Sequence, residues 1–255
     1  MKTLNLILSV AVIMAMVSCK KSIKTPELPD APTRCQVTIV EHLYTNNNKV
    51  VTDSYYYTYD SGLRISRIDY GKPQSNEFET YTYAPNKVTW KGVGGDTEVY
   101  NLDASGKIIS AIQGSDVLNF KYNGDDQMIE AAIRNDIETF TYLNGNLSSA
   151  SYNSTPWSTF TYGNERPSNQ IVYSWVYSDK FLDFDEISNR VIPYIGKTSN
   201  NLPTKIITNP GTRDQITFDF NYTRDADGNI TSVKVSVTEG GVKTNEEYKF
   251  TYNCN

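Results

Sequence analysis

Few residues in this 255-residue chain could act as nucleophiles or as acid–base groups. It contains one histidine, His42, and three cysteines, Cys19, Cys35 and Cys254. Glu41 precedes His42, but neighbouring side chains on a strand point to opposite faces. So few histidines and cysteines leave no Ser-His-Asp, Cys-His or zinc constellation. We therefore expect His42 to be a surface or half-buried residue of the first strand, and we expect no catalytic, metal or cofactor site.

Acidic residues are the remaining candidates, because hydrolysis of a glycosidic bond needs only two carboxyl groups. Residues 225–229 also look like half of a calcium loop, but the remaining ligands and the bidentate glutamate are missing. The candidate acids fall in predicted turns, at a helix start or on a strand face exposed to water. Carboxylates are expected at such solvated positions without any function. We keep an acidic hydrolase as an alternative function, drawing on Asp125, Asp126, Asp183, Asp185, Glu186, Glu246 and Glu247.

Aromatic residues are abundant, with 19 Tyr, 9 Phe and 3 Trp. Trp90, Trp157 and Trp175 are therefore candidates for stacking on a ligand such as a glycan. The other interpretation is that the rings form the core. Tyr suits a partly filled barrel interior, because its hydroxyl can meet water or a polar partner.

The N-terminal residues 1–18 have the pattern of a secretory signal peptide. Met1 and Lys2 give a short positive start, an apolar run follows to Val17, and Ser18 precedes Cys19. A cysteine directly after a small residue at this point resembles a bacterial lipobox. The apolar run is shorter than the roughly 20 residues that a spanning helix needs. The sequence therefore predicts that Cys19 is lipidated and anchors the protein to a membrane.

Residues 19–34 are predicted to form a lipid-attached tether. Pro26, Pro29 and Pro32 are spaced by three, which favours an extended, polyproline-like chain. The folded domain is then expected at residues 35–255, which can form one domain. The net charge of −5 and the pI near 5.0 argue against a nucleic-acid partner.

An aromatic-x-aromatic unit recurs along the folded part. Its second residue falls at positions 59, 83, 102, 122, 142 and 162, so the last three steps are 20 residues each. Two rings spaced by two point to one face of a strand, which we expect to be the inner face. Turn residues such as Asn144 and Gly145 follow each unit. Each repeat is therefore predicted to be one hairpin.

The fold class predicted from these repeats is all-β. We expect about 14 to 16 antiparallel strands, closed or nearly closed into a water-soluble barrel. The rhythm breaks between Tyr162 and Tyr222. There, Phe181, Phe184 and Val191 fall at helical spacing and predict one short helix at residues 179–191, with an irregular loop as the alternative.

Cys35 and Cys254 lie at the two ends of the predicted domain. If the first and last strands pair in antiparallel orientation, the start of one lies beside the end of the other. An exported compartment permits disulfides. We therefore predict a Cys35–Cys254 disulfide, and two free thiols are the alternative.

Two resemblances to known families rest on particular segments. Tyr222-Thr-Arg-Asp225-Ala-Asp-Gly228-Asn229-Ile230 resembles the YD repeat, which is the hairpin unit of Rhs-type shells. The lipobox, the 20-residue hairpins and Ser199-Asn-Asn-Leu202-Pro203-Thr-Lys-Ile206 together resemble a family of Bacteroidetes lipoproteins of unknown function with a porin-like fold. The second resemblance covers nearly all of the mature chain. It implies a many-stranded antiparallel barrel, and it implies neither an activity nor functional residues.

The function expected from the sequence is therefore that of an envelope lipoprotein that binds or scaffolds other molecules without catalysis. A membrane pore is a further alternative, but the strands are short and their second face is polar. We expect a monomer with a glycan or an envelope protein as partner. Lys20, Lys21 and Ser22 follow Cys19 without an acidic run, which favours the periplasmic side of the outer membrane over the cell surface.

Overall fold

The computed structural model describes residues 35–167, 171–172, 175 and 196–254. The chain divides into two compact units, Met1–Arg34 and Cys35–Asn255, and the described residues all belong to the second. The predicted signal peptide, Cys19, the tether and the helix at residues 179–191 lie outside the described residues. None of the helices among the described residues is long and apolar enough to cross a bilayer.

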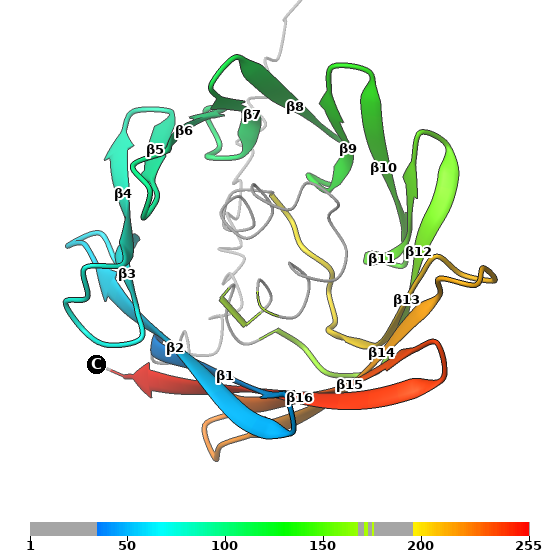
Figure 1. Ribbon diagram of the computed structural model, residues 1–255. Helices are drawn as coiled ribbons and strands as arrows, with labels where there is room; N and C mark the ends of the chain where they lie inside the picture. Colours follow the sequence, from blue (N-terminus) through cyan, green and yellow to red (C-terminus); the bar gives the residue numbers. More distant parts are fainter. Residues whose placement is uncertain (1–34, 168–170, 173–174, 176–195, 255) are drawn as a thin grey trace, which may run out of the picture. The chain divides into compact units, whose positions relative to one another are not determined.

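The described chain forms a closed antiparallel barrel in which consecutive strands are neighbours and β1 pairs with β16 (Figure 1). This confirms the predicted all-β class, the closure and the upper end of the predicted strand number. The sixteen strands found in this part of the chain are β1 (Gln36–Asn46), β2 (Lys49–Tyr59), β3 (Ile65–Tyr70), β4 (Phe78–Ala84), β5 (Lys87–Lys91), β6 (Thr97–Leu102), β7 (Ile108–Gln113), β8 (Asp116–Tyr122), β9 (Met128–Ile133), β10 (Asp136–Leu143), β11 (Asn146–Tyr152), β12 (Thr155–Tyr162), β13 (Pro203–Thr208), β14 (Ile216–Arg224), β15 (Ile230–Glu239) and β16 (Val242–Asn253).

The six repeat units and two more, Phe220/Tyr222 and Phe250/Tyr252, lie on the eight even-numbered strands and face the interior, with Leu102 in place of the second ring on β6. Phe120, Phe140 and Phe250 are 8%, 4% and 5% exposed and belong to one continuous hydrophobic core. Thr141, which lies between the two rings of its pair, is exposed on the other face. Because the two rings of a pair are two residues apart, both lie on the inner face of the barrel wall, as predicted from the sequence.

The second residue of each pair is tyrosine at seven of eight positions, and a hydrogen bond explains this. Each odd-numbered strand that accepts this bond begins at a register shift with the strand before it, for example at Ile108, where the β6–β7 ladder shifts between Asn101 and Leu102. The hydroxyl then donates to a backbone carbonyl at the start of the preceding strand. Burial raises the pKa of Tyr122 and Tyr222, so these hydroxyls stay protonated and can donate. At 2.7 Å, these bonds join Tyr83 to Ile65, Tyr122 to Ile108, Tyr222 to Pro203 and Tyr252 to Ile230.

All turns that lead from an even to an odd strand lie at one end of the barrel, which we call the Asx end; the other end is the tip end. At the Asx end, the side chain of the first turn residue closes the loop. In the turn at residues 103–107, the carboxylate of Asp103 accepts from the backbone N–H groups of Ser105 and Lys107 at 2.8 and 3.0 Å. The turns that begin at Asp60, Asn123 and Asp225 repeat this pattern.

These turns predict a specific sensitivity to acid. Hydrogen bonds from the Ser105 side chain and from the turn backbone lower the pKa of Asp103. Its stabilisation is therefore complete above the ordinary pKa of aspartate, about 4, and is lost as the pH falls through the lowered folded pKa. We expect Asp103→Ala to lower the urea midpoint at pH 7 and to lower it much less near pH 2.

Asp103→Asn is the matched control, because Asn123 shows that an amide oxygen serves in the same turn position. This variant should retain more stability at pH 7 than Asp103→Ala. An alanine variant whose deficit persists unchanged in acid would contradict the role given to the carboxylate.

A segment between β12 and β13 reaches into the interior. Ile171 and Val172 are helical residues that are 7% and 0% exposed, and both belong to the core. Trp175 donates its indole N–H to the Tyr57 hydroxyl at 3.0 Å. Its ring also lies 4.6 Å from the ring of Tyr55. The strands therefore surround packed side chains from this segment.

The returning residues 196–202 close over the Asx end. Ser199 accepts a hydrogen bond from the backbone N–H of Leu147 at 3.0 Å, and Asn201 exchanges bonds with Asn146 at 2.9 and 3.2 Å. Gly196 has a φ of +77°, and a Cβ there would lie 2.4 Å from a backbone oxygen. The first residues of the segment that carries the resemblance to the lipoprotein family thus bind the start of β11 through hydrogen bonds, just before β13 begins.

Candidate functional site

The three tryptophans predicted to stack on a ligand all face the interior, and their indole N–H groups have internal partners. Trp90 on β5 donates to Glu79 at 2.5 Å, and Trp157 on β12 donates to Glu138 at 3.1 Å. Trp90 is only 5% exposed, so it offers almost no ring surface to a ligand. A stacking role for Trp157 and Trp175 stays a prediction.

Buried glutamates are the polar feature of the interior that the sequence analysis missed. Glu79, Glu98 and Glu138 are 6%, 0% and 0% exposed. Each lies two residues before the first ring of an aromatic pair, so each points to the same inner face. Tyr100 donates its hydroxyl to Glu98 at 2.6 Å. A buried charge requires such partners, and strand alternation was the signal that could have found these residues.

His42 is half-buried, as predicted, but its partner is distant in sequence. Its Nε2 lies 3.2 Å from Glu246 on β16, and its ring stacks on that of Tyr248 at 4.5 Å. Tyr248 also donates its hydroxyl to Glu246 at 3.1 Å. This cluster joins β1 to β16 on the inner side of the wall.

The carboxylates weighed as a catalytic pair are not brought together. Glu246 binds His42 on the inner face, whereas Glu247 accepts from Ser232 at 2.8 Å on the outer face. Asp126 forms an ion pair with Lys107. Asp125 lies in an exposed turn, and the turn at residues 225–229 is closed by its own Asp225. Asp183, Asp185 and Glu186 lie outside the described residues.

Within the part of the chain that the structure describes, no cluster of three or more His, Cys, Asp or Glu side chains could hold a metal ion. Cys35 and Cys254 are joined by a disulfide at the Asx end, with their Cα atoms 4.1 Å apart. This bond connects the first residue before β1 to the first residue after β16.

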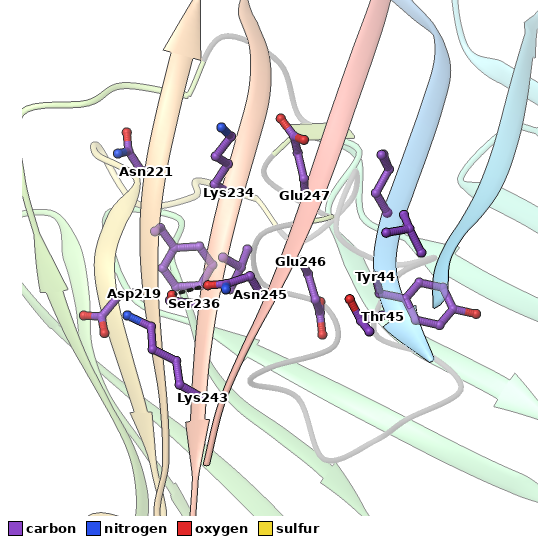
Figure 2. A pocket seen from close by; sticks show the side chains of 14 residues that line it. Tyr44, Thr45, Asp219, Asn221, Lys234, Ser236, Lys243, Asn245, Glu246 and Glu247 are labelled. Atoms are coloured by element: carbon purple, nitrogen blue, oxygen red, sulfur yellow. Dashed lines mark hydrogen bonds between the residues drawn. The ribbon is translucent and has the colours of Figure 1, made fainter. Parts of the chain in front are cut away.

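A groove lies at the tip end, where two hairpins separate. The pairing of β1 with β16 ends at Leu43 and Glu247. Beyond that point, β1 continues with β2 as far as Asn46, and β16 continues with β15 as far as Val242. Figure 2 shows β1 and β16 diverging, with Thr45 and Glu246 between them. The groove at this split has a volume of about 850 Å³.

The groove is lined by side chains of both charges, by amides and by a few apolar groups. Asp219 pairs with Lys205 at 3.3 Å, and Glu247 is held by Ser232 and by Lys249 at 3.9 Å. Lys234 and Lys243 also line the groove, and neither has an ion pair among the described residues. The arrangement leaves two ammonium groups able to bind an anionic group.

No family model matches the chain, and no curated protein matches it. A porin-like protein from Bacteroides uniformis ATCC 8492 has a TM-score of 0.64 at 17% identity, covering 87% of this chain and 98% of that chain. This chain shares its fold. A porin-like protein from Bacteroides vulgatus ATCC 8482 has a TM-score of 0.56 at 15% identity, covering 85% of this chain and 98% of that chain.

The likeness to both porin-like proteins extends over nearly all of their length. At these identities, the comparison establishes the fold and no function. The YD-repeat and lipoprotein resemblances stay predictions.

Proposed function

We propose that this protein is a lipid-anchored envelope protein whose barrel stands in water beside the membrane and binds or scaffolds other molecules without catalysis. Cys19 would carry the lipid and residues 20–34 would act as the tether. The periplasmic face of the outer membrane is the favoured location, and the partner is a glycan or another envelope protein.

Charged pairs on the outer wall are the observation that carries this proposal. Lys121 on β8 pairs with Glu130 on β9 at 2.6 Å, and Lys205 on β13 pairs with Asp219 on β14. A lysine on the lipid face of a membrane barrel costs about 2–4 kcal/mol at the midplane. Both pairs therefore favour a wall that faces water.

Strand length supports the same conclusion. A strand that spans a bilayer needs about 9–11 residues. Strands β3, β6, β7, β9 and β13 have 6 residues each, and β5 has 5. The packing of Ile171 and Val172 in the interior also argues for a filled barrel over a pore, which is the alternative function.

A non-catalytic role is supported by the separate engagement of the acids. The adjacent Glu246 and Glu247 point to opposite faces, so they cannot flank one bond as a glycosidase requires. Hydrolysis of envelope glycans by the purified protein would favour the alternative of an acidic hydrolase.

The anchor is tested by fractionation. We expect Cys19→Ala to move the protein from the membrane fraction to the soluble fraction, because the signal sequence then directs no lipid attachment. The readout is a carbonate wash followed by immunoblotting. Cys35→Ser is the control, since it removes a cysteine of the barrel and should leave the protein in the membrane.

A Cys19→Ala protein that resists the carbonate wash would overturn the lipid anchor. Conductance measured on the wild-type protein in planar bilayers is a second check. Stable channels would instead favour the pore.

A further inference from the structure

The split between the two longest hairpins exposes two strand edges inside an otherwise closed ring. Residues 44–46 of β1 pair with β2 but not with β16, and residues 242–246 of β16 pair with β15 but not with β1. Thr45, Val242 and Asn245 are exposed. Residues 49–53 of β2, in the same hairpin as β1, likewise pair with β1 but not with β3.

An unpaired strand edge presents backbone N–H and C=O groups in the pattern that another strand needs. Extended peptides bind other proteins in this way: main-chain hydrogen bonds give affinity, and pockets for alternate side chains give specificity. The groove beside these edges has a volume of about 850 Å³, and Figure 2 shows lining residues from both strands, such as Thr45 of β1 and Asn245 of β16.

We propose that this split binds an extended peptide segment of an envelope protein, which adds as a strand to the free edge of β16. The inference rests on the proposed function of a binding module and names its class of partner. The peptide carries an acidic side chain on its outer face, directed to Lys243 and Lys234.

The lysines of the groove favour a peptide that carries an acidic side chain. Lys243 lies on the free edge itself, and Lys234 lies one strand further along the same outer face. The neighbouring carboxylates are already engaged, Asp219 by Lys205 and Glu247 by Lys249 and Ser232. A peptide carboxylate therefore meets two ammonium groups that form no ion pair among the described residues, although Lys234 lies opposite Glu247 in the β15–β16 ladder. Leu43 and Val50 add apolar contacts at the β1 side.

The test uses the full chain in detergent micelles and a phage-displayed library of random peptides of about twelve residues, enough for one strand. Enriched peptides are synthesised and their affinities are measured by calorimetry. We expect an acidic residue in an alternating, β-branched context. Methylating the backbone nitrogens of one alternate set should weaken binding by about tenfold or more, because only that set faces β16. Methylating the other set should have little effect.

Protein variants locate the site independently. Lys234→Gln combined with Lys243→Gln should weaken binding of the acidic peptides and abolish the preference for acid. Lys91→Gln is the control: it removes one exposed lysine of β5, outside the groove lining, and should bind normally. Equal thermal melting of all three proteins ensures that the comparison concerns binding.

Several outcomes would overturn the proposal. These are failure to enrich any binder, equal loss with either methylated set, or unchanged affinity in the double variant. Concentration-dependent dimers that dissociate in the double variant would assign the edge to a second copy of this chain instead. None of these outcomes affects the fractionation of Cys19→Ala, so failure of this inference is distinguishable from failure of the anchor.

Discussion

Replacing Phe140 by alanine should lower the free energy of unfolding by about 3–5 kcal/mol. Its ring is 4% exposed within the continuous core of the barrel, so truncation removes buried apolar surface and leaves a cavity. Thr141→Ala, one residue away on the exposed face, should cost less than about 1 kcal/mol. The measurement is urea unfolding followed by tyrosine and tryptophan fluorescence.

The difference between Phe140 and Thr141 tests the prediction that the aromatic pairs face the interior of the barrel. A small loss at both positions would mean that the aromatic pairs are a surface stripe available to ligands. Phe140→Leu adds a graded control, because it keeps an apolar side chain in the core and should lose less stability than the alanine variant.

Removing the Cys35–Cys254 disulfide should produce the other large loss of stability. The bond joins residues 219 apart, and the chain-entropy model gives about 5 kcal/mol for a loop of this length, with measured values often lower. We expect Cys35→Ser combined with Cys254→Ser to lower the unfolding midpoint substantially. Reduction of the wild-type protein should reproduce that loss.

Thiol titration checks the bond directly. Denatured, unreduced Cys19→Ala protein should contain no reactive thiol, and reduction should release two per chain. Two reactive thiols before reduction would exclude the disulfide. The double serine variant should show no difference between oxidised and reduced conditions, which separates the bond from other effects of the reductant.

The architecture was accessible from sequence because it repeats. Period-two spacing fixed the face of every aromatic pair, and turn residues such as Asn144 and Gly145 separated the strands. Because each repeat of about 20 residues has one pair, the hairpin number followed, and eight pairs correspond to the sixteen strands of the described chain. The identity of the second ring as tyrosine has a local cause, since its hydroxyl donates to a backbone carbonyl at the start of the preceding strand, as Tyr122 does to Ile108.

The interior acids were missed, although the same alternation applies to them. Glu98 lies two residues before Tyr100 and therefore shares its face, but a charged residue is usually assigned to solvent. One partner also lies on another repeat: Trp157 reaches Glu138 across β11, whereas Tyr100 binds Glu98 of its own strand. Partners that are distant in sequence cannot be derived from a local pattern.

The groove could not have been predicted either, because it also depends on strands that are distant in sequence. It exists because the β1–β16 ladder ends at Leu43 while both strands continue in their own hairpins. Strand length is readable from sequence only approximately, and the point at which two remote strands part depends on the curvature of the whole wall. His42 gained a partner, Glu246, through the same remote pairing.

Closure by β1 and β16 imposes an order on folding. β1 begins at Gln36 and its neighbour β16 ends at Asn253, so β1 cannot gain this neighbour until the last strand has been made. Pairings between distant strands form slowly, and an unpaired edge is prone to aggregation. Until then, the chain is an open sheet whose Cys35 and Cys254 are far apart. If the chain is exported, as proposed above, a periplasmic holding chaperone and a late-acting thiol oxidase should raise its yield.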